Sequence, residues 1–115
     1  MADGPLVVRK TFSYEEAIAL LPEVRRLTED AYHKVEALEE AAASERATAE
    51  NIQGEVTAIV TGWARVLVEM GLEVKGLWLV DFNNGSGYYC WRHPEPALQF
   101  YHSYEDGFRG RMRIQ

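Results

Sequence analysis

The sequence predicts an α+β fold in which a long antiparallel helical hairpin is followed by a small three-stranded antiparallel sheet. In the first part of the chain, apolar residues recur every three or four positions, as they do on one face of an α-helix. Of the 13 aromatic residues, 9 fall between Trp78 and Phe108, where Gly and Pro separate short runs typical of strands. At 115 residues we expect a single domain, with the hairpin at 13–71 and a β-meander and tail at 76–115.

The charge of the chain is unevenly distributed. Residues 1–75 hold 14 acidic and 8 basic residues, whereas residues 76–115 hold 4 of each. Because an acidic surface repels phosphate backbones, we expect no nucleic-acid partner. No stretch approaches the roughly 20 apolar residues of a membrane span, so we expect no membrane contact. With one cysteine and no signal-peptide pattern, we expect a cytoplasmic protein.

The N-terminal region carries the start signal of the first helix. Residues 6–9 could form a short strand after a proline. Ser13 and Glu16 have the spacing of a capping box, which satisfies free amide groups at a helix start. A short helix at 14–21 should follow. Because proline fits a first turn but not a helix interior, we expect a kink or a restart at Pro22.

Two amphipathic helices follow. The first, at 22–43, has an apolar stripe formed by Val24, Leu27, Ala31, Val35, Leu38 and Ala42. Ser44 can end this helix or cap the next one. The second, from about Glu45 to Met70, has a stripe formed by Ile52, Val56, Ile59, Val60, Trp63, Val66, Leu67 and Met70. Gly71 is a natural C-terminal stop, and the short connection predicts an antiparallel hairpin.

Small residues recur every four positions beside the second stripe, at Gly54, Ala58 and Gly62. Glycine inside a helix costs about 1 kcal/mol relative to alanine, so a row of small residues suggests a close approach of two backbones. This row would allow either tight packing inside the hairpin or a helix–helix contact between two copies of the chain. We expect a homodimer.

The aromatic region predicts three strands, at roughly 76–82, 88–92 and 97–103. Asn84-Gly85 is a strong signal for a two-residue hairpin turn, because both central residues of that turn need positive φ. The second connection, centred on Glu95-Pro96, contains prolines that cannot continue a strand ladder. These turns set Leu79 opposite Cys90 and Asp81 opposite Tyr88, with Cys90 near His102.

Alternation along the strands predicts two different faces. One face receives Leu79, Asp81, Cys90, Arg92, Phe100 and His102. The other receives Trp78, Val80, Phe82, Tyr89, Trp91 and Tyr101. The second face is the more apolar, so we expect the helices to cover it. The first mixes aromatic and polar groups, as a small binding pocket does.

The polar face suggests two kinds of chemistry. A zinc or iron site could use Cys90 and His102, with Asp81 or Glu95 as the third ligand. A lone cysteine is more commonly a small buried apolar residue. Acid–base catalysis could use His102 with the same carboxylates. Ser86 lies in a hairpin loop rather than in the strand–turn–helix setting of a catalytic serine.

The remaining candidates are basic. If the tail is extended, Arg109, Arg111 and Arg113 share one side. They would then pair with the acidic helices or clamp a carboxylate, which guanidinium groups bind through two hydrogen bonds. We expect His33 to be structural or exposed and His93 to be exposed in a loop.

Several segments occur together in the order of a known family. They are 11–17 with 20–22, 74–76 with 80–82, 90–92 with Glu95, and His102 with 107–108 and Arg109 or Arg111. This pattern resembles the bacterial domain-of-unknown-function family 2203 over nearly the whole chain. The chain departs from that family at Pro94, where the family has Gly, and at Tyr101, where it has Trp. The resemblance places Asp81, Cys90, Trp91, Glu95, His102 and the tail arginines in the family pattern, and it implies no established activity.

These observations predict a binding protein rather than a recognisable enzyme. The candidate ligand-binding residues are Asp81, Cys90, Arg92, Glu95, His102, Arg109 and Arg111. The leading hypothesis is a dimeric module for a small-molecule ligand or for protein interaction, because the chain lacks a complete catalytic motif. The alternative is a small metalloprotein or enzyme that uses the Asp, Cys, Glu and His residues of the sheet.

Overall fold

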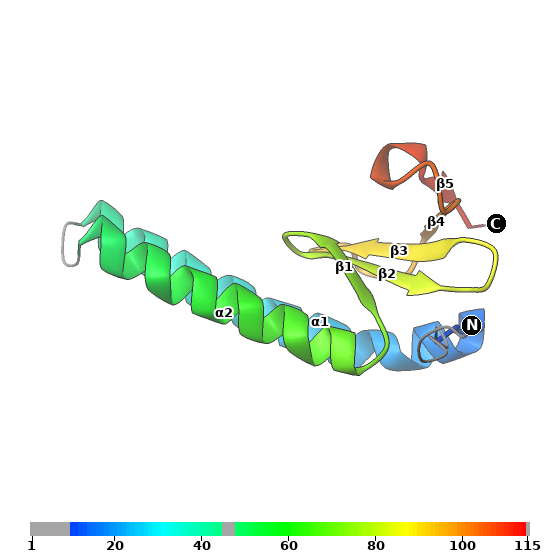
Figure 1. Cartoon of the computed structure of the whole chain (residues 1–115), viewed down its shortest axis with the longest axis horizontal. Helices are drawn as coiled ribbons and strands as arrows, with labels where there is room; N and C mark the ends of the chain where they lie inside the picture. The colour runs from blue at the N-terminus through cyan, green and yellow to red at the C-terminus, as the bar shows by residue number, and fades with distance from the viewer. Residues whose placement is uncertain (1–9, 45–47, 115) are drawn as a thin grey trace, which may run out of the picture.

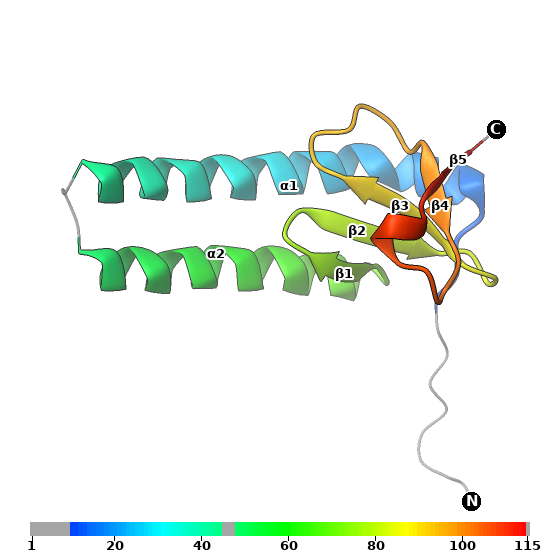
Figure 2. The ribbon, with the colours of Figure 1, turned by 90° about the horizontal axis from the view of Figure 1, so that it is seen from above.

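The fold is a helical hairpin with a sheet packed across one end. The structure is a computed structural model and describes residues 10–44 and 48–114. The helices are α1 (Tyr14–Ala43) and α2 (Ala49–Glu69), with a short 3₁₀ helix η1 (Phe108–Gly110). The strands are β1 (Glu73–Gly76), β2 (Leu79–Asn83), β3 (Tyr88–Arg92), β4 (Phe100–His102) and β5 (Met112–Arg113). The helices lie side by side and extend well beyond the sheet (Figures 1 and 2).

The predicted α+β class and the helical hairpin are therefore correct, but the sheet has five strands rather than three. Two expectations lie outside the described residues, namely the strand at 6–9 and the beginning of the second helix at Glu45. The described part of α2 begins with Thr48 as its cap, since the Thr48 side chain accepts from the backbone N–H of Asn51.

α1 is one continuous helix that contains Pro22, so of the predicted kink or restart the restart is wrong. The capping box is present, because Ser13 Oγ accepts from the N–H of Glu16 and the Glu16 carboxylate accepts from the N–H of Ser13. Pro22 removes only the hydrogen bond to the carbonyl of Ile18, and both residues are exposed. Burial of neighbouring Leu21 against the rest of the core outweighs that loss.

The hairpin is held by an apolar seam with one polar link. Trp63 of α2 donates its indole N–H to Thr28 Oγ1 of α1 at 2.9 Å, and both side chains are buried. Gly54 and Gly62 are exposed, and a Cβ added at either would meet nothing within 4 Å. The small residues therefore do not serve tight packing inside the hairpin. Within the described part of the chain, neither helix is long and apolar enough to cross a membrane.

The sheet is a simple antiparallel meander in the order β1-β2-β3-β4-β5. The predicted strand at 76–82 is divided, because the chain turns between β1 and β2 at Trp78, which has a φ of 65°. Positive φ is unfavourable for a bulky side chain. Here the indole packs against Trp63, with ring centroids 5.0 Å apart, and against Tyr32 at 5.8 Å. Those contacts hold a turn that has no local sequence signal.

The register differs from the prediction by two residues. Asp81 pairs with Cys90, not with Tyr88, and Leu79 pairs with Arg92. The cause is a longer turn, in which the N–H of Asn84 donates to the carbonyl of Gly87. The side chains of Asn83 and Asn84 accept from the backbone N–H groups two residues further on. The predicted pairing around Glu95-Pro96 is shifted likewise, because Cys90 pairs with Phe100. An even shift leaves each side chain on its predicted face.

The two faces of the sheet are covered by different parts of the chain. Val80, Phe82 and Trp91 are fully buried in the core shared with the helices, as predicted. The opposite face is covered by the segment that follows β4, which turns back over the sheet and returns as β5 (Figure 1). The tail is therefore not an extended strand beside the acidic helices. This arrangement buries the polar face that carries the candidate site.

Candidate functional site

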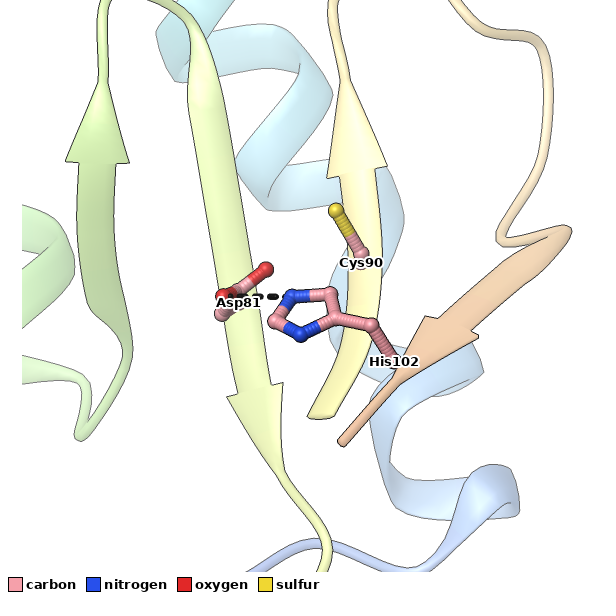
Figure 3. A group of neighbouring side chains, drawn as sticks. All are labelled: Asp81, Cys90 and His102. Carbon is pink, nitrogen blue, oxygen red and sulfur yellow. Dashed lines mark hydrogen bonds and ion pairs between the residues drawn. The ribbon is translucent and has the colours of Figure 1, made fainter. Parts of the chain in front are cut away.

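Three chemically reactive side chains meet on the sheet face that points away from the helices. Asp81 of β2 lies directly opposite Cys90 of β3, and His102 reaches them from β4 (Figure 3). Their relative exposures are 1%, 0% and 3%. One ligand atom from each residue lies within 4.8 Å of the other two. The structure thus brings together the three residues proposed from the sequence as metal ligands.

The hydrogen bonds of His102 fix where its protons are. Nδ1 lies 2.8 Å from the carbonyl oxygen of Ser103, which can only accept, so Nδ1 carries a proton. Nε2 lies 2.9 Å from Asp81 Oδ2, and a second proton must occupy that hydrogen bond. The pair is therefore an imidazolium with a carboxylate, or a neutral imidazole with a carboxylic acid.

The second oxygen of Asp81 is left without a partner. Oδ1 is buried and, among the residues that the structure describes, it accepts no hydrogen bond. Burial raises the pKa of Asp81, and the neighbouring His102 imidazole and the Cys90 thiol, which is close enough to interact with this carboxyl group, oppose that rise. A buried carboxylate oxygen without a donor is costly, by about 1–3 kcal/mol or more for a charged group. Such an atom in a folded protein calls for an explanation, and a bound ligand is one.

Cys90 is not an activated nucleophile. Burial, followed by the nearby Asp81 carboxylate, raises the pKa of its thiol to about 12. His102 directs its Nε2 to Asp81 instead of Cys90 (Figure 3). Thiol catalysis requires a thiolate, normally produced by a lowered pKa or an adjacent base. The arrangement argues against a cysteine hydrolase and leaves Cys90 available as a ligand.

Glu95 belongs to a separate, closed interaction. Its carboxylate accepts two hydrogen bonds from Arg111, at 2.7 and 3.1 Å, and one from the backbone N–H of Arg92 at 2.8 Å. The Arg111 guanidinium also stacks on Phe100 and Phe108, 4.0 and 4.3 Å from the ring centroids. The predicted carboxylate clamp thus binds a carboxylate of its own chain, and Glu95 does not join the cluster.

The other candidate residues lie apart from the cluster. Arg92 is exposed and stacks over Phe108, while Arg109 is exposed within η1. The three tail arginines do not all share one side as predicted, because η1 interrupts the tail at Arg109. Arg111 and Arg113 both lie over the Phe100 ring, at 4.0 and 5.1 Å, and Arg111 also pairs with Glu95. His93 is not an exposed loop residue, since its ring packs on Tyr32 with centroids 4.6 Å apart. His33 is exposed, which is one of the two alternatives expected from the sequence.

A cavity of about 240 Å³ borders the cluster on one side. Asp81 and His102 form part of its wall, and the other lining residues are Lys75, Leu79, Tyr88, Tyr104, Gly107 and Phe108. The sequence reading did not include Lys75, Tyr88 or Tyr104 in the site. Tyr88 pairs with His102 across the sheet, so a correct register would have found it. Lys75 reaches the cavity from β1, and Tyr104 reaches it from the chain reversal after β4. Neither segment has a local sequence signal that predicts this position.

A larger groove, of about 490 Å³, lies elsewhere, between α1 and Pro96–Leu98. Its charged side chains are already paired within α1, Arg25 with Glu29 and Arg26 with Glu23. The smaller cavity is bordered by buried Asp81 and His102, which makes it the candidate site.

The donor set of the cluster suits a transition-metal ion. A thiolate, an imidazole nitrogen and a carboxylate oxygen are all zinc ligands, and zinc centres with three protein ligands keep a fourth position for water or substrate. The ligand atoms come from three neighbouring strands, so the backbone fixes their spacing. The unpartnered Oδ1 of Asp81 is an atom that a cation would satisfy.

Fold and site together define a small α+β protein with a buried Asp–Cys–His cluster that is covered by the segment between β4 and β5. The chain belongs to the family described as "Uncharacterized conserved protein (DUF2203)", whose model matches residues 10–114. Neither a curated protein nor a solved structure matches the chain.

Proposed function

We propose that the protein is a metal-binding module that holds one divalent transition-metal ion, with Zn²⁺ as the first choice, through Asp81, Cys90 and His102. The observation that carries the proposal is the buried Asp81 Oδ1 without a donor, in a group of three ligand atoms within 4.8 Å of one another. Buried polar groups in folded proteins are nearly always satisfied, so this unpartnered oxygen beside two further ligand atoms supports a cation site here.

Charge balance supports a divalent ion. The metal-free cluster holds one proton in the Asp81–His102 hydrogen bond and one on the Cys90 thiol. Coordination needs a carboxylate, a thiolate and a neutral imidazole, so both protons leave when the ion enters. The divalent ion brings two positive charges and the two departing protons remove two, so the net charge of the buried site does not change. A monovalent or trivalent ion would change the net charge of this buried group of ligands.

The surroundings are compatible with a thiolate ligand. Arg111 Nη1 lies 3.9 Å from Cys90 Sγ, and its positive charge lowers the pKa of the thiol, against the larger effect of burial. His102 keeps its Nδ1–H on the carbonyl of Ser103, which leaves Nε2 to bind the metal and fixes the ring orientation.

Elemental analysis of untagged protein tests the proposal. We expect about one equivalent of zinc or iron per chain, or its uptake after chelation and exposure to Zn²⁺, and loss of that ion in the Cys90→Ala, His102→Ala variant. The matched control is His33→Ala, which removes an exposed histidine paired only with Glu36. Because the double variant could also lose its fold, circular dichroism must show native helix content. A parent chain that takes up no zinc or iron would contradict the proposal.

A second copy of the chain is the proposed partner. Gly54 and Gly62 are exposed without a packing role inside the chain, although each costs about 1 kcal/mol of helix stability relative to alanine. A groove of about 260 Å³ between α2 and α1 is lined mainly by apolar residues, among them Ala58, Gly62 and the 40%-exposed Val66, with the Asp30–Lys34 ion pair of α1 also in its wall. A helix from a second copy would cover this apolar surface, as in four-helix bundles.

Sedimentation equilibrium tests the homodimer. We expect a dimer at micromolar concentration, and a monomer for Gly62→Leu, because the larger side chain fills the groove. The control is Thr61→Leu, a change of similar size at the adjacent exposed position. A monomeric parent, or equal behaviour of the two variants, would argue against this interface.

We also propose a reducing compartment, the cytoplasm, as the place where the module works. The reason is that a lone cysteine acting as a metal ligand must stay unoxidised.

A further inference from the structure

The cavity beside the cluster reaches it from the side of Asp81 and His102. Asp81 and His102 form part of the cavity wall, whereas Cys90 does not. Cys90 lies on the other side of the cluster, against the guanidinium of Arg111. An ion held by these three residues would therefore have protein behind it and the cavity in front of it. Because such three-ligand centres keep a fourth position open, that position would face the cavity.

We propose that this cavity is the binding site for a short-chain carboxylate, which supplies the fourth ligand of the metal. The inference rests on the metal site proposed above and assigns to it a class of small-molecule ligand. Three features of the cavity lead to this class: its size, the apolar character of most of its wall, and the single cation at its edge.

The size restricts the ligand to a few atoms. A volume of about 240 Å³ corresponds to on the order of eight water molecules, at roughly 30 Å³ each. Drug-sized ligands occupy cavities of about 300–1,000 Å³. The cavity therefore fits a molecule such as propionate or butyrate and is too small to enclose a nucleotide.

Most of the wall is apolar or aromatic. Leu79 and Phe108 have no polar side-chain atoms, and the phenol groups of the two tyrosines are engaged elsewhere. Tyr88 donates to Glu73 at 3.0 Å, and Tyr104 donates to Asn83 at 2.7 Å. The wall thus presents ring surfaces rather than free donors, which suits an alkyl chain and gives a sugar little to bind.

Lys75 supplies the positive charge. Partial burial lowers the pKa of its ammonium group, but the hydrogen bond and charge of Glu73 raise it further, so Lys75 is protonated at neutral pH. Its Nζ lies 3.1 Å from Glu73 Oε1 and 4.6 Å from the centre of the Tyr88 ring. Glu73 is not part of the cavity wall, so the ammonium group of Lys75 is the charge that faces a ligand there, and it favours an anion over a neutral analogue of the same shape.

The Co²⁺-loaded protein provides the test, because the visible spectrum of cobalt responds to a change of ligand. Acetate, propionate and butyrate are titrated against it, with 1-butanol as the neutral control. We expect saturable spectral changes with the acids only, and about fourfold tighter binding for each added methylene group until the cavity is full. Lys75→Met should weaken butyrate binding about three- to tenfold without changing Co²⁺ affinity. The matched control is Lys34→Met, which removes a lysine paired with Asp30 on α1.

The outcomes separate the two proposals. If Co²⁺ does not bind at all, the metal site itself is wrong and this inference falls with it. If Co²⁺ binds but no carboxylate changes the spectrum, the centre is closed and only this inference is overturned. Equal affinities for the three acids, or equal effects of the two lysine variants, would also overturn it, because the cavity would then contribute nothing.

Discussion

Two acid–base pairs lie close together on the same sheet face, and they differ in completeness. The pair of Glu95 and Arg111 is closed, since the guanidinium meets both carboxylate oxygens and a backbone N–H adds a third hydrogen bond. The pair of Asp81 and His102 is more deeply buried, yet one carboxylate oxygen has no partner among the described residues. The deeper pair is thus the less satisfied one.

Of the two carboxylates, that of Glu95 is structural. Glu95 has a defined task, because its ion pair with Arg111 joins the tail to the end of β3 and covers the cluster. Asp81 joins no comparable pair of chain segments that would explain its burial. It lies instead beside a thiol and a cavity. Polar groups kept in an unsatisfied state are typical of binding and catalytic sites.

The largest effect is expected from His102→Ala. This variant leaves the Asp81 carboxyl group buried without its imidazole, and breaking a buried ion pair costs about 3–5 kcal/mol. Urea denaturation of the metal-free protein measures the change in unfolding free energy. His33→Ala, at an exposed site, should change it by less than about 0.5 kcal/mol. Equal effects of the two variants would mean that the Asp81–His102 pair is not buried as described.

The next effect concerns the reactivity of Cys90. Because its thiol pKa is raised from 9.0 to about 12, the native thiolate fraction near pH 8 should be about a thousandfold lower than in the unfolded chain. Iodoacetamide should therefore alkylate metal-free native protein far more slowly than protein in urea. As pH rises, the rate in urea should level off above pH 9, while the native rate continues to increase towards pH 12. Rapid alkylation of native protein at pH 8 would contradict this.

A smaller effect is expected from Glu95→Gln. Glutamine keeps one oxygen acceptor but loses the charge, and a hydrogen bond to a charged group contributes about 1.5–3 kcal/mol. The unfolding free energy should fall by about that amount, while the affinity for Zn²⁺ stays within about twofold. Loss of metal binding in a folded Glu95→Gln variant would show that the two pairs are not independent.

The smallest effect concerns His93. Burial against Tyr32 and Trp91 lowers its pKa, so below pH 6.5 the unfolded chain binds more protons than the folded one. Stability should therefore fall as pH decreases through that range. Measured as the difference between the parent and His93→Gln, the unfolding free energy of the parent should decrease between pH 7.5 and pH 5.5. A constant difference would mean that the ring is solvated in the folded state.

The spacing of apolar residues along the chain predicted most of the fold. The hairpin followed from apolar stripes on both helices, and the capping box at Ser13 gave the start of α1 correctly. The two faces of the sheet were also predicted, even though both turns were assigned wrongly. Each register error was a shift by two residues, and side chains along a strand alternate between the faces with a period of two. Asp81, Cys90 and His102 therefore stayed on one face.

The parts that could not be predicted depend on contacts between distant residues. The turn at Trp78 has no local turn signal beyond Gly76 and is held by Trp63 of α2. The pairing of Glu95 with Arg111 needs the tail to fold back over the sheet, which periodicity does not encode. The cavity wall formed by Lys75 and Tyr104 has the same origin, since both reach it through chain reversals.

A cadmium titration followed by ultraviolet absorption tests the central claim most directly, because a thiolate bound to Cd²⁺ produces a charge-transfer band that free thiol lacks. We predict a band that saturates at one Cd²⁺ per chain, is displaced by Zn²⁺, and is absent in folded Cys90→Ser. It should persist in His33→Ala. A native chain that gives no such band at neutral pH would contradict the assignment of Asp81, Cys90 and His102 as a metal centre.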